Sequence, residues 1–122
     1  MTTKALVIDD NRNTADSLCQ MLSLLDVQTT AAYSPRGAFL LLQETLPDIV
    51  FVDLNMPGVT GHEVVTFVRR DPNLEHIPVV VVTSDDQEET AQQVRKEGAL
   101  DIIIKPATFE AVEAVLKKAK LI

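Results

Sequence analysis

The sequence lacks the features expected of a secreted or membrane-bound chain. Its only cysteine is Cys19, so no disulfide can form within the chain, and this usage fits a reducing compartment. No apolar run has the length of a membrane span, and residues 1–4 do not begin a signal peptide. We therefore expect a soluble, cytoplasmic protein with no membrane partner.

Basic residues are also scarce. Eleven lysines and arginines stand against 18 acids, giving a formal charge of −7. Non-specific binding to nucleic acid depends on basic side chains that neutralise phosphates, so we expect no nucleic-acid partner. The basic residues of 117–120 lie at the end of a predicted helix, where the helix dipole favours cations.

The composition is that of an ordinary globular domain, with 46% hydrophobic and 24% charged residues. A chain of 122 residues is long enough for one core and too short for two domains. No linker, internal repeat or low-complexity tract divides it. We expect a single domain over residues 1–122, with no effector domain after the last helix.

Short apolar runs alternate with amphipathic helical stretches along the whole chain. This alternation predicts an α/β fold with a doubly wound, five-stranded parallel sheet. The runs are continuously apolar, which is typical of strands covered by helices on both faces. The predicted strands are 6–8, 29–32, 49–53, 79–82 and 102–104.

Five helices are predicted between and after these strands. Ser34 followed by Pro35 is typical of a helix N-cap and first helical position. The acidic run 85–89 favours a helix start, because the helix dipole stabilises acids there. The predicted helices cover about 13–25, 35–43 and 61–70, with two more starting near 85 and 108.

Polar residues lie at the carboxyl ends of four of the predicted strands. They are Asp9 and Asp10, then Asp53, then Thr83, and finally Lys105. The carboxyl ends of parallel strands meet at one edge of a sheet, which is where ligands bind in doubly wound folds. We therefore expect one polar cluster at that edge.

The three acids of this cluster need a cation or a proton. At an effective dielectric near 20, two carboxylates ~4 Å apart repel by about 4 kcal/mol. Mg²⁺ or Mn²⁺, which keep several waters, suit such an all-oxygen site. Ca²⁺ fits less well, because no loop supplies the oxygens it requires. Zn²⁺ is not expected, because His62, His76 and Cys19 show no convergent spacing, and we expect both histidines to be solvated surface residues.

A carboxylate beside a divalent ion can also act as a nucleophile toward phosphorus, forming an aspartyl phosphate. Phosphoryl transfer depends on charge stabilisation at the equatorial oxygens more than on acid and base groups. A hydroxyl from Thr83, the ammonium of Lys105 and the metal ion would provide that stabilisation for Asp53.

The chain resembles a response-regulator receiver domain, the phosphoacceptor module of two-component signalling, over essentially its whole length. The resemblance rests on four motifs in order, which together are specific. It implies a flavodoxin-like strand order of 2-1-3-4-5. The motifs are Leu6-Val7-Ile8-Asp9-Asp10-Asn11, Val52-Asp53-Leu54-Asn55-Met56-Pro57-Gly58 with Gly61, Ile77 to Ser84, and Gly98-Ala99 with Ile104-Lys105-Pro106.

The resemblance implies a role for each site residue. Asp53 would accept the phosphoryl group from a phosphohistidine on a histidine kinase or histidine phosphotransfer protein. Mg²⁺ would be held by Asp9 and Asp10, with Asp10, Asp53 and the backbone carbonyl of Asn55 as direct ligands. The domain would be a self-phosphorylated acceptor, with possible autodephosphorylation, and not a turnover enzyme.

The resemblance also implies how the phosphoryl group is sensed. Thr83 would hydrogen-bond it, and Lys105, followed by a cis bond to Pro106, would pair with it. The fourth helix, fifth strand and fifth helix would then present an altered surface to a downstream protein target. Many receivers carry Tyr or Phe three residues before the lysine, where this chain has Ile102, so the usual aromatic switch is absent.

Asp85 lies two residues beyond Thr83, at a family position that flanks the path of attacking water. We expect it to tune the lifetime of the phosphoryl group, together with Asn55.

Two other function classes compete with this interpretation. A phosphohydrolase of the haloacid-dehalogenase type would use Asp9 as nucleophile and need an acid two residues later, where Asn11 stands. A pseudo-receiver would keep the fold as a binding module without phosphorylation. Such modules typically lose the acceptor, the acids or the lysine, and all of these are present here.

Overall fold

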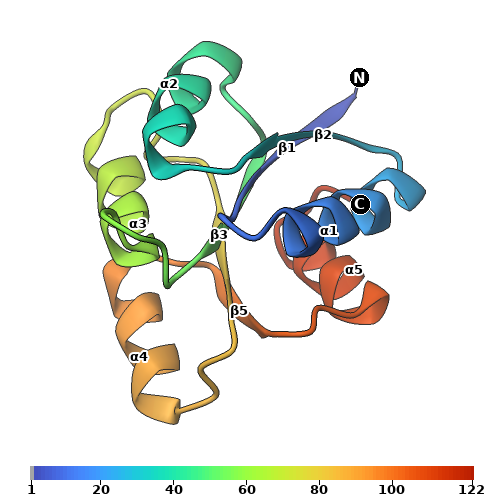
Figure 1. Ribbon diagram of the computed structural model, residues 1–122. Coiled ribbons are helices and arrows are strands. Elements are labelled where there is room, and N and C mark those ends of the chain that lie inside the picture. Colours follow the sequence, from blue (N-terminus) through green and yellow to red (C-terminus); the bar gives the residue numbers. More distant parts are fainter. Residues whose placement is uncertain (1) are drawn as a thin grey trace.

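The computed structural model describes residues 2–122, which form a parallel sheet between two layers of helices (Figure 1). The strand order is β2-β1-β3-β4-β5, so the predicted doubly wound, flavodoxin-like sheet is confirmed. The strands are β1 (Thr3–Ile8), β2 (Val27–Ala32), β3 (Ile49–Asp53), β4 (Val79–Thr83) and β5 (Asp101–Ile104).

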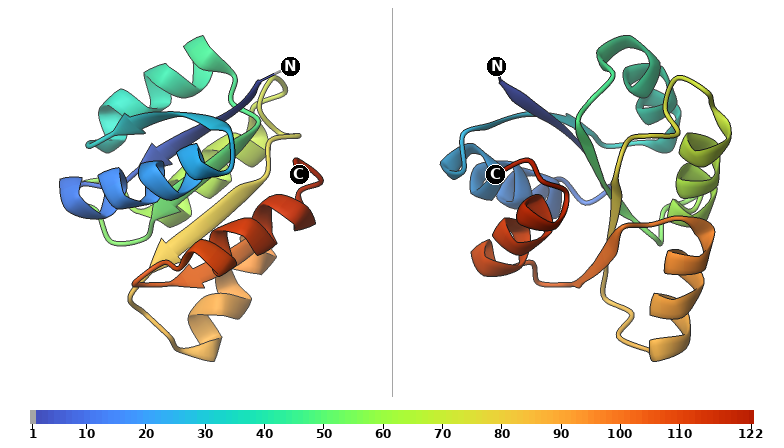
Figure 2. Two further views of the ribbon diagram at one scale, coloured as in Figure 1. Left: turned by 90° about the vertical axis from the view of Figure 1, so that its right-hand side faces the viewer. Right: turned by 180° about the vertical axis from the view of Figure 1, so that it is seen from behind.

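The helices cover both faces of the sheet, as the continuous apolar strands predicted. Helices α1 and α5 pack on one face, and α2, α3 and α4 pack on the other (Figure 2). Within residues 2–122, no helix is both long and apolar enough to cross a membrane. The helices are α1 (Arg12–Leu24), α2 (Pro35–Thr45), α3 (Gly61–Arg70), α4 (Glu88–Glu97) and α5 (Phe109–Lys118).

The core consists of two apolar clusters, one on each face, because successive strand residues point to opposite sides. In β1, Leu6 and Ile8 join the cluster under α2, α3 and α4, whereas Ala5 and Val7 join the cluster under α1 and α5. Every residue of β3 and β4 is buried. These two central strands therefore fix the positions of the residues at their carboxyl ends.

Four of the helices begin at a side-chain cap. Asn11, Ser34, Thr60 and Thr108 each accept a hydrogen bond from a backbone N–H of the first turn, and Pro35 takes the first helical position as predicted. The exception is α4, whose N-cap residue makes no such bond.

The acidic run before α4 is divided between loop and helix. We predicted a helix start near 85, but the helix begins at Glu88, because the Asp85 carboxylate accepts a bond from the Gln87 N–H and closes a turn before it. The strand β2 begins at Val27, earlier than predicted, because its polar residues pair with β1 at the edge of the sheet.

Candidate functional site

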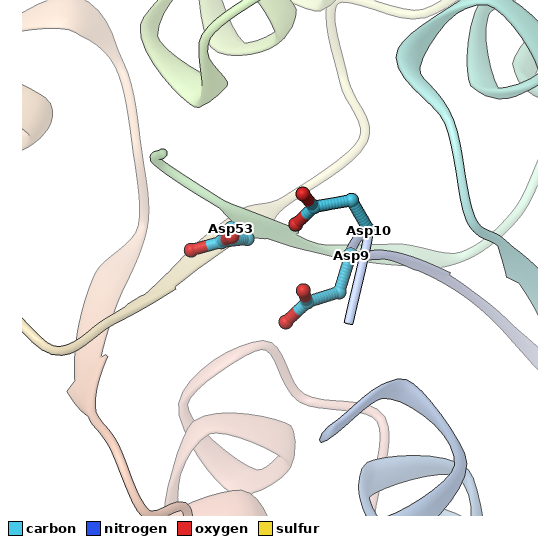
Figure 3. Close-up of side chains that lie close together, drawn as sticks. All are labelled: Asp9, Asp10 and Asp53. Carbon is cyan, nitrogen blue, oxygen red and sulfur yellow. The ribbon is translucent and has the colours of Figure 1, made fainter. Parts of the chain in front are cut away.

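The carboxyl ends of β1 and β3 bring three aspartates together. Ile8 pairs with Val52 in the sheet, so the next residues, Asp9 and Asp53, lie side by side, and Asp10 follows (Figure 3). Carboxylate oxygens of the three residues lie within 4.8 Å of one another. The predicted acidic cluster is therefore present, with Asp9 and Asp53 buried and Asp10 exposed.

Lys105 contacts two of these acids. Its Nζ atom lies 3.0 Å from Asp9 Oδ2 and 3.3 Å from Asp53 Oδ1. Its backbone N–H donates to the Thr83 carbonyl at 2.8 Å, which ties the lysine to the end of β4. The Lys105–Pro106 bond is cis, as the resemblance implied. The ammonium of Lys105 therefore lies within the acidic cluster.

The electrostatics of the cluster disfavour the ionised form of Asp53. Burial and the neighbouring charge of Asp9 raise its pKa, against the opposing effects of Lys105 and a backbone hydrogen bond from Asn55. Burial disfavours the Lys105 ammonium as well, but its bonds with Asp9 and Asp53 outweigh this, and the pKa of Lys105 is raised. The site holds more negative charge than one ammonium stabilises.

The other two aspartates of the cluster, Asp9 and Asp10, differ in their contacts. Asp9 Oδ1 accepts a bond from the Asn11 N–H at 2.9 Å, while Oδ2 contacts Lys105, so both oxygens already have a partner. Asp10 is exposed beside Asp53 (Figure 3). Carboxylate and carbonyl oxygens are the donors preferred by Mg²⁺ and Mn²⁺, so the residues present fit such an ion.

Thr83 lies at the end of β4, beside the strand that ends in Asp53. It is fully buried, and Asp53 pairs with the preceding residue, Val82. Its Oγ1 accepts a hydrogen bond from the Asp85 N–H at 3.2 Å. A hydroxyl that accepts this bond can still donate its own hydrogen toward the acidic cluster.

The Asp85 carboxylate faces α4. Oδ1 accepts from the Gln87 N–H at 2.9 Å, and Oδ2 accepts from the Thr90 hydroxyl at 2.6 Å. These bonds, that of Thr90 first, lower the pKa of Asp85. Sequence analysis did not identify Thr90; an aspartate followed by a threonine five residues later, across a helix start, was the only available signal.

Ile102 occupies the position of the absent aromatic switch. It pairs with Val81 and packs, half-buried, against the cluster under α2, α3 and α4. The next residue on the same face of β5, Ile104, is 41% exposed and pairs with Thr83. The Ile102 side chain has no polar group that could form a hydrogen bond with Thr83, so any coupling between the two residues depends on packing.

The two histidines differ. His76 is exposed, as expected. His62, near the start of α3, has a side chain that is 37% exposed, and its Nδ1 lies 2.6 Å from Oε1 of Glu97 at the end of α4, a contact that the sequence did not predict. Among the described residues, the one group of acids, histidines and cysteines with metal-binding geometry is the aspartate cluster. Cys19 is half-buried in α1, and burial raises the pKa of its thiol.

Gly61 has a role that its motif alone did not reveal. A Cβ atom at this position would lie 2.5 Å from the Asp53 carbonyl oxygen and 2.8 Å from Leu54 Cα. The first turn of α3 therefore packs directly against the backbone that carries Asp53, which only glycine permits.

An open pocket of about 410 Å³ lies beside Lys105, between the first turns of α1 and the loop after β5. Its lining includes Asn13, Thr14, Ser17, Ser84, Pro106 and Ala107.

Comparisons with known proteins agree with this geometry. The family model described as the response regulator receiver domain matches residues 5–117. The chain is 32% identical over 113 residues to the two-component response regulator ORR8 of Oryza sativa, covering 92% of this chain and 93% of that protein. It is 29% identical over 109 residues to protein PilH of Pseudomonas aeruginosa, covering 89% and 90%.

Solved structures of response regulators are also similar to this chain. The chemotaxis response regulator CheY4 of Vibrio cholerae superposes with a TM-score of 0.89 at 25% identity, covering 98% of this chain and 99% of that one. The similarity therefore extends over nearly the whole of each chain.

Proposed function

Because this chain belongs to the response regulator receiver domain family, we propose that Asp53 is the residue through which it acts as a phosphoacceptor. Receiver domains are signalling modules that interact with histidine kinases and downstream effectors, and as a class they are not turnover enzymes. The observation that carries the assignment is the contact of buried Asp53 with Lys105 at the carboxyl end of the sheet.

The proposed reaction is a phosphoryl transfer from a phosphohistidine. An Asp53 oxygen forms a bond to phosphorus as the P–N bond breaks, and the imidazole leaves with the bonding pair and takes up a proton. Lys105 pairs with the oxygens of the transferred group, and Thr83 donates a hydrogen bond to one of them. Both residues are already held at the strand ends beside Asp53.

The acidic cluster fits Mg²⁺, or Mn²⁺, which Asp10, Asp53 and the backbone carbonyl of Asn55 would hold. Asp9 contributes its charge, because both of its oxygens already have partners. Bound there, the ion supplies positive charge to the phosphoryl oxygens.

We propose that Asp85 and Asn55 set how long the phosphoryl group persists. Both lie in the loops that follow Thr83 and Asp53, at positions that the resemblance places beside the path of attacking water. In Asp85→Ala the rate of phosphate loss should change, and an unaltered rate would contradict this role.

The proposed phosphodonor is a histidine kinase or a histidine phosphotransfer protein, and the proposed recipient of the signal is a downstream protein. Response regulators are typically cytoplasmic, which is the compartment we propose. The haloacid-dehalogenase alternative is not supported, because Asn11, where that chemistry needs an acid, caps α1 through its side chain.

Incubation with Mg²⁺ and a small acyl phosphate, followed by intact mass measurement, tests the proposal. The expected result is a mass increase of one phosphoryl group that disappears when Mg²⁺ is chelated beforehand. A wild-type chain that gains no phosphate would instead favour the pseudo-receiver.

A further inference from the structure

Two side-chain contacts tie the first turns of α1 to the end of β2. The Tyr33 hydroxyl donates to Asp16 Oδ1 at 2.7 Å, and the Arg12 guanidinium lies over the Tyr33 ring, with Cζ 4.1 Å from its centroid. We propose that these contacts, the Tyr33 clasp, position Asp10 for the divalent metal ion. The inference rests on the metal site of the proposed function.

The Tyr33 clasp lies beside the acidic cluster. The Asp9 N–H donates to the Ala32 carbonyl at 3.1 Å, so the pairing of β1 with β2 continues to the edge of the sheet where Tyr33 follows. Neighbouring strands are about 5 Å apart, which places Tyr33 one strand away from the acids that follow β1. Arg12 is the first residue of α1, two residues beyond Asp10. Figure 2 shows α1 alongside β2.

Asp10 has less support than the other two acids of the cluster. Asp9 and Asp53 are buried and contact Lys105, whereas Asp10 is exposed. Among the hydrogen bonds and ion pairs within residues 2–122, none involves the Asp10 carboxylate. The position of this carboxylate therefore depends on the backbone of the short loop 9–11.

That loop joins a helix start with little apolar packing of its own. Arg12 and Asn13 are exposed, and the buried residues of α1 begin at Ala15. Tyr33 is half-buried against the cluster under α1 and α5, so its ring is a fixed support for Arg12. The bond to Asp16 raises the pKa of Tyr33, so the phenol keeps the proton that it donates. The Tyr33 clasp thus restrains the helix start to which loop 9–11 is joined.

Restraint of the helix start should raise the affinity of the site for the ion. A ligand group already held near its bound position loses less conformational freedom on binding. Release of the Tyr33 clasp should leave Asp9 and Asp53 in place and let loop 9–11 carry Asp10 through more positions. By reciprocity, a bound ion should restrain the clasp.

Tyr33→Leu tests the Tyr33 clasp without changing the charge of the chain. Leucine keeps an apolar side chain against the core and removes both the ring below Arg12 and the hydroxyl that bonds Asp16. Calorimetric titration with Mg²⁺ alone, at fixed ionic strength and well below the melting temperature of each variant, measures the affinity. The affinity should fall about fivefold, the effect of ordering one more side chain on binding. Tyr33→Phe keeps the ring and should lie between Tyr33→Leu and the wild type.

Amide hydrogen exchange in residues 9–16 measures the restraint itself. In the metal-free chain, exchange in this segment should be about fivefold faster in Tyr33→Leu than in the wild type, because the contacts that oppose local opening are lost. Unchanged exchange would contradict the positioning role of Tyr33.

Phe39→Leu is the matched control. It removes another half-buried ring, which packs against Phe67 on the opposite face of the sheet, and it should lower the melting temperature without changing the Mg²⁺ affinity. An equal loss of affinity in Phe39→Leu would assign the effect to general destabilisation and overturn the inference. If the wild type binds no Mg²⁺, the proposed metal site fails; if it binds Mg²⁺ and Tyr33→Leu binds it equally well, only the Tyr33 clasp fails.

Discussion

Lys105 Nζ lies 3.3 Å from Asp53 Oδ1, although Asp53 ends β3 and Lys105 follows β5, two strands that are not neighbours in the sheet. The same nitrogen lies 3.0 Å from Asp9 Oδ2. A single ammonium thus neutralises part of a cluster of three acids and occupies the position from which it can reach a phosphoryl group on Asp53.

Lys105→Met should separate the effect of Lys105 on the charge of the cluster from its effect on phosphoryl transfer. Removing the ammonium leaves the acids with more uncompensated charge, so Mg²⁺ should bind about tenfold more tightly. Phosphate uptake should be about a hundredfold slower, because a group that stabilises the transition state is lost. Calorimetric titration with Mg²⁺ and the time course of intact mass measure the two quantities.

The control is Lys4→Met, which removes the same charge from the exposed start of β1. It should change neither quantity appreciably. Weaker Mg²⁺ binding in Lys105→Met would contradict the charge balance described for the cluster.

Asp53→Asn should stabilise the chain in the absence of Mg²⁺. Burial and Asp9 raise the pKa of Asp53, so its contribution to the free energy of unfolding declines as pH rises from the ordinary aspartate value through the raised pKa. At neutral pH the neutral variant should therefore melt a few degrees higher.

Thermal melts of the wild type and Asp53→Asn over a range of pH test the direction of this difference in melting temperature. The difference should vanish below about pH 3.9, where the wild-type carboxyl is protonated in both states. Added Mg²⁺ should stabilise the wild type preferentially and reduce the difference. A variant that melts lower than the wild type at neutral pH, without metal, would contradict the assigned cause of the shift.

Gly61→Ala should destabilise the chain by about 1–3 kcal/mol, since overpacking forces neighbouring atoms to move. The displaced atoms belong to the backbone of Asp53 and Leu54, so phosphate uptake should fall as well. Denaturant unfolding and intact mass measure the two effects.

Gly37→Ala is the matched control, because its new Cβ would meet only Ser34 Oγ at 3.5 Å within α2. It should be neutral or stabilise by about 0.5–1 kcal/mol. Equal effects of the two substitutions would show that the close approach of Gly61 to β3 is not important.

The sheet and its polar edge could be predicted from sequence because each depends on local pattern. Continuous apolar runs marked β3 and β4, and each run ended at a residue with reactive chemistry, Asp53 and Thr83. The edge strand β2 was predicted less well, because the three consecutive polar residues Gln28 to Thr30 resemble a loop. Helix starts could be predicted where a side chain caps the helix, as Ser34 does for α2. The start of α4 could not, because its N-cap residue makes no side-chain hydrogen bond.

The contacts that sequence could not provide are those between distant elements. His62 and Glu97 are both ordinary surface residue types, and only the packing of α3 against α4 brings them together. The approach of Gly61 to the Asp53 backbone likewise depends on how α3 returns to the sheet. Such pairs have no local pattern, so the assembled fold is needed to find them.

The central claim is that Asp53 carries the phosphoryl group, and locating the acyl phosphate tests it most directly. After reaction with Mg²⁺ and a small acyl phosphate, borohydride reduces an aspartyl phosphate to homoserine, which tandem mass spectrometry assigns to a position. The account predicts homoserine at residue 53 in the wild type and in the control Asp26→Asn, and none in Asp53→Asn. Homoserine at another aspartate in the wild type, or phosphate uptake that persists in Asp53→Asn, would contradict it.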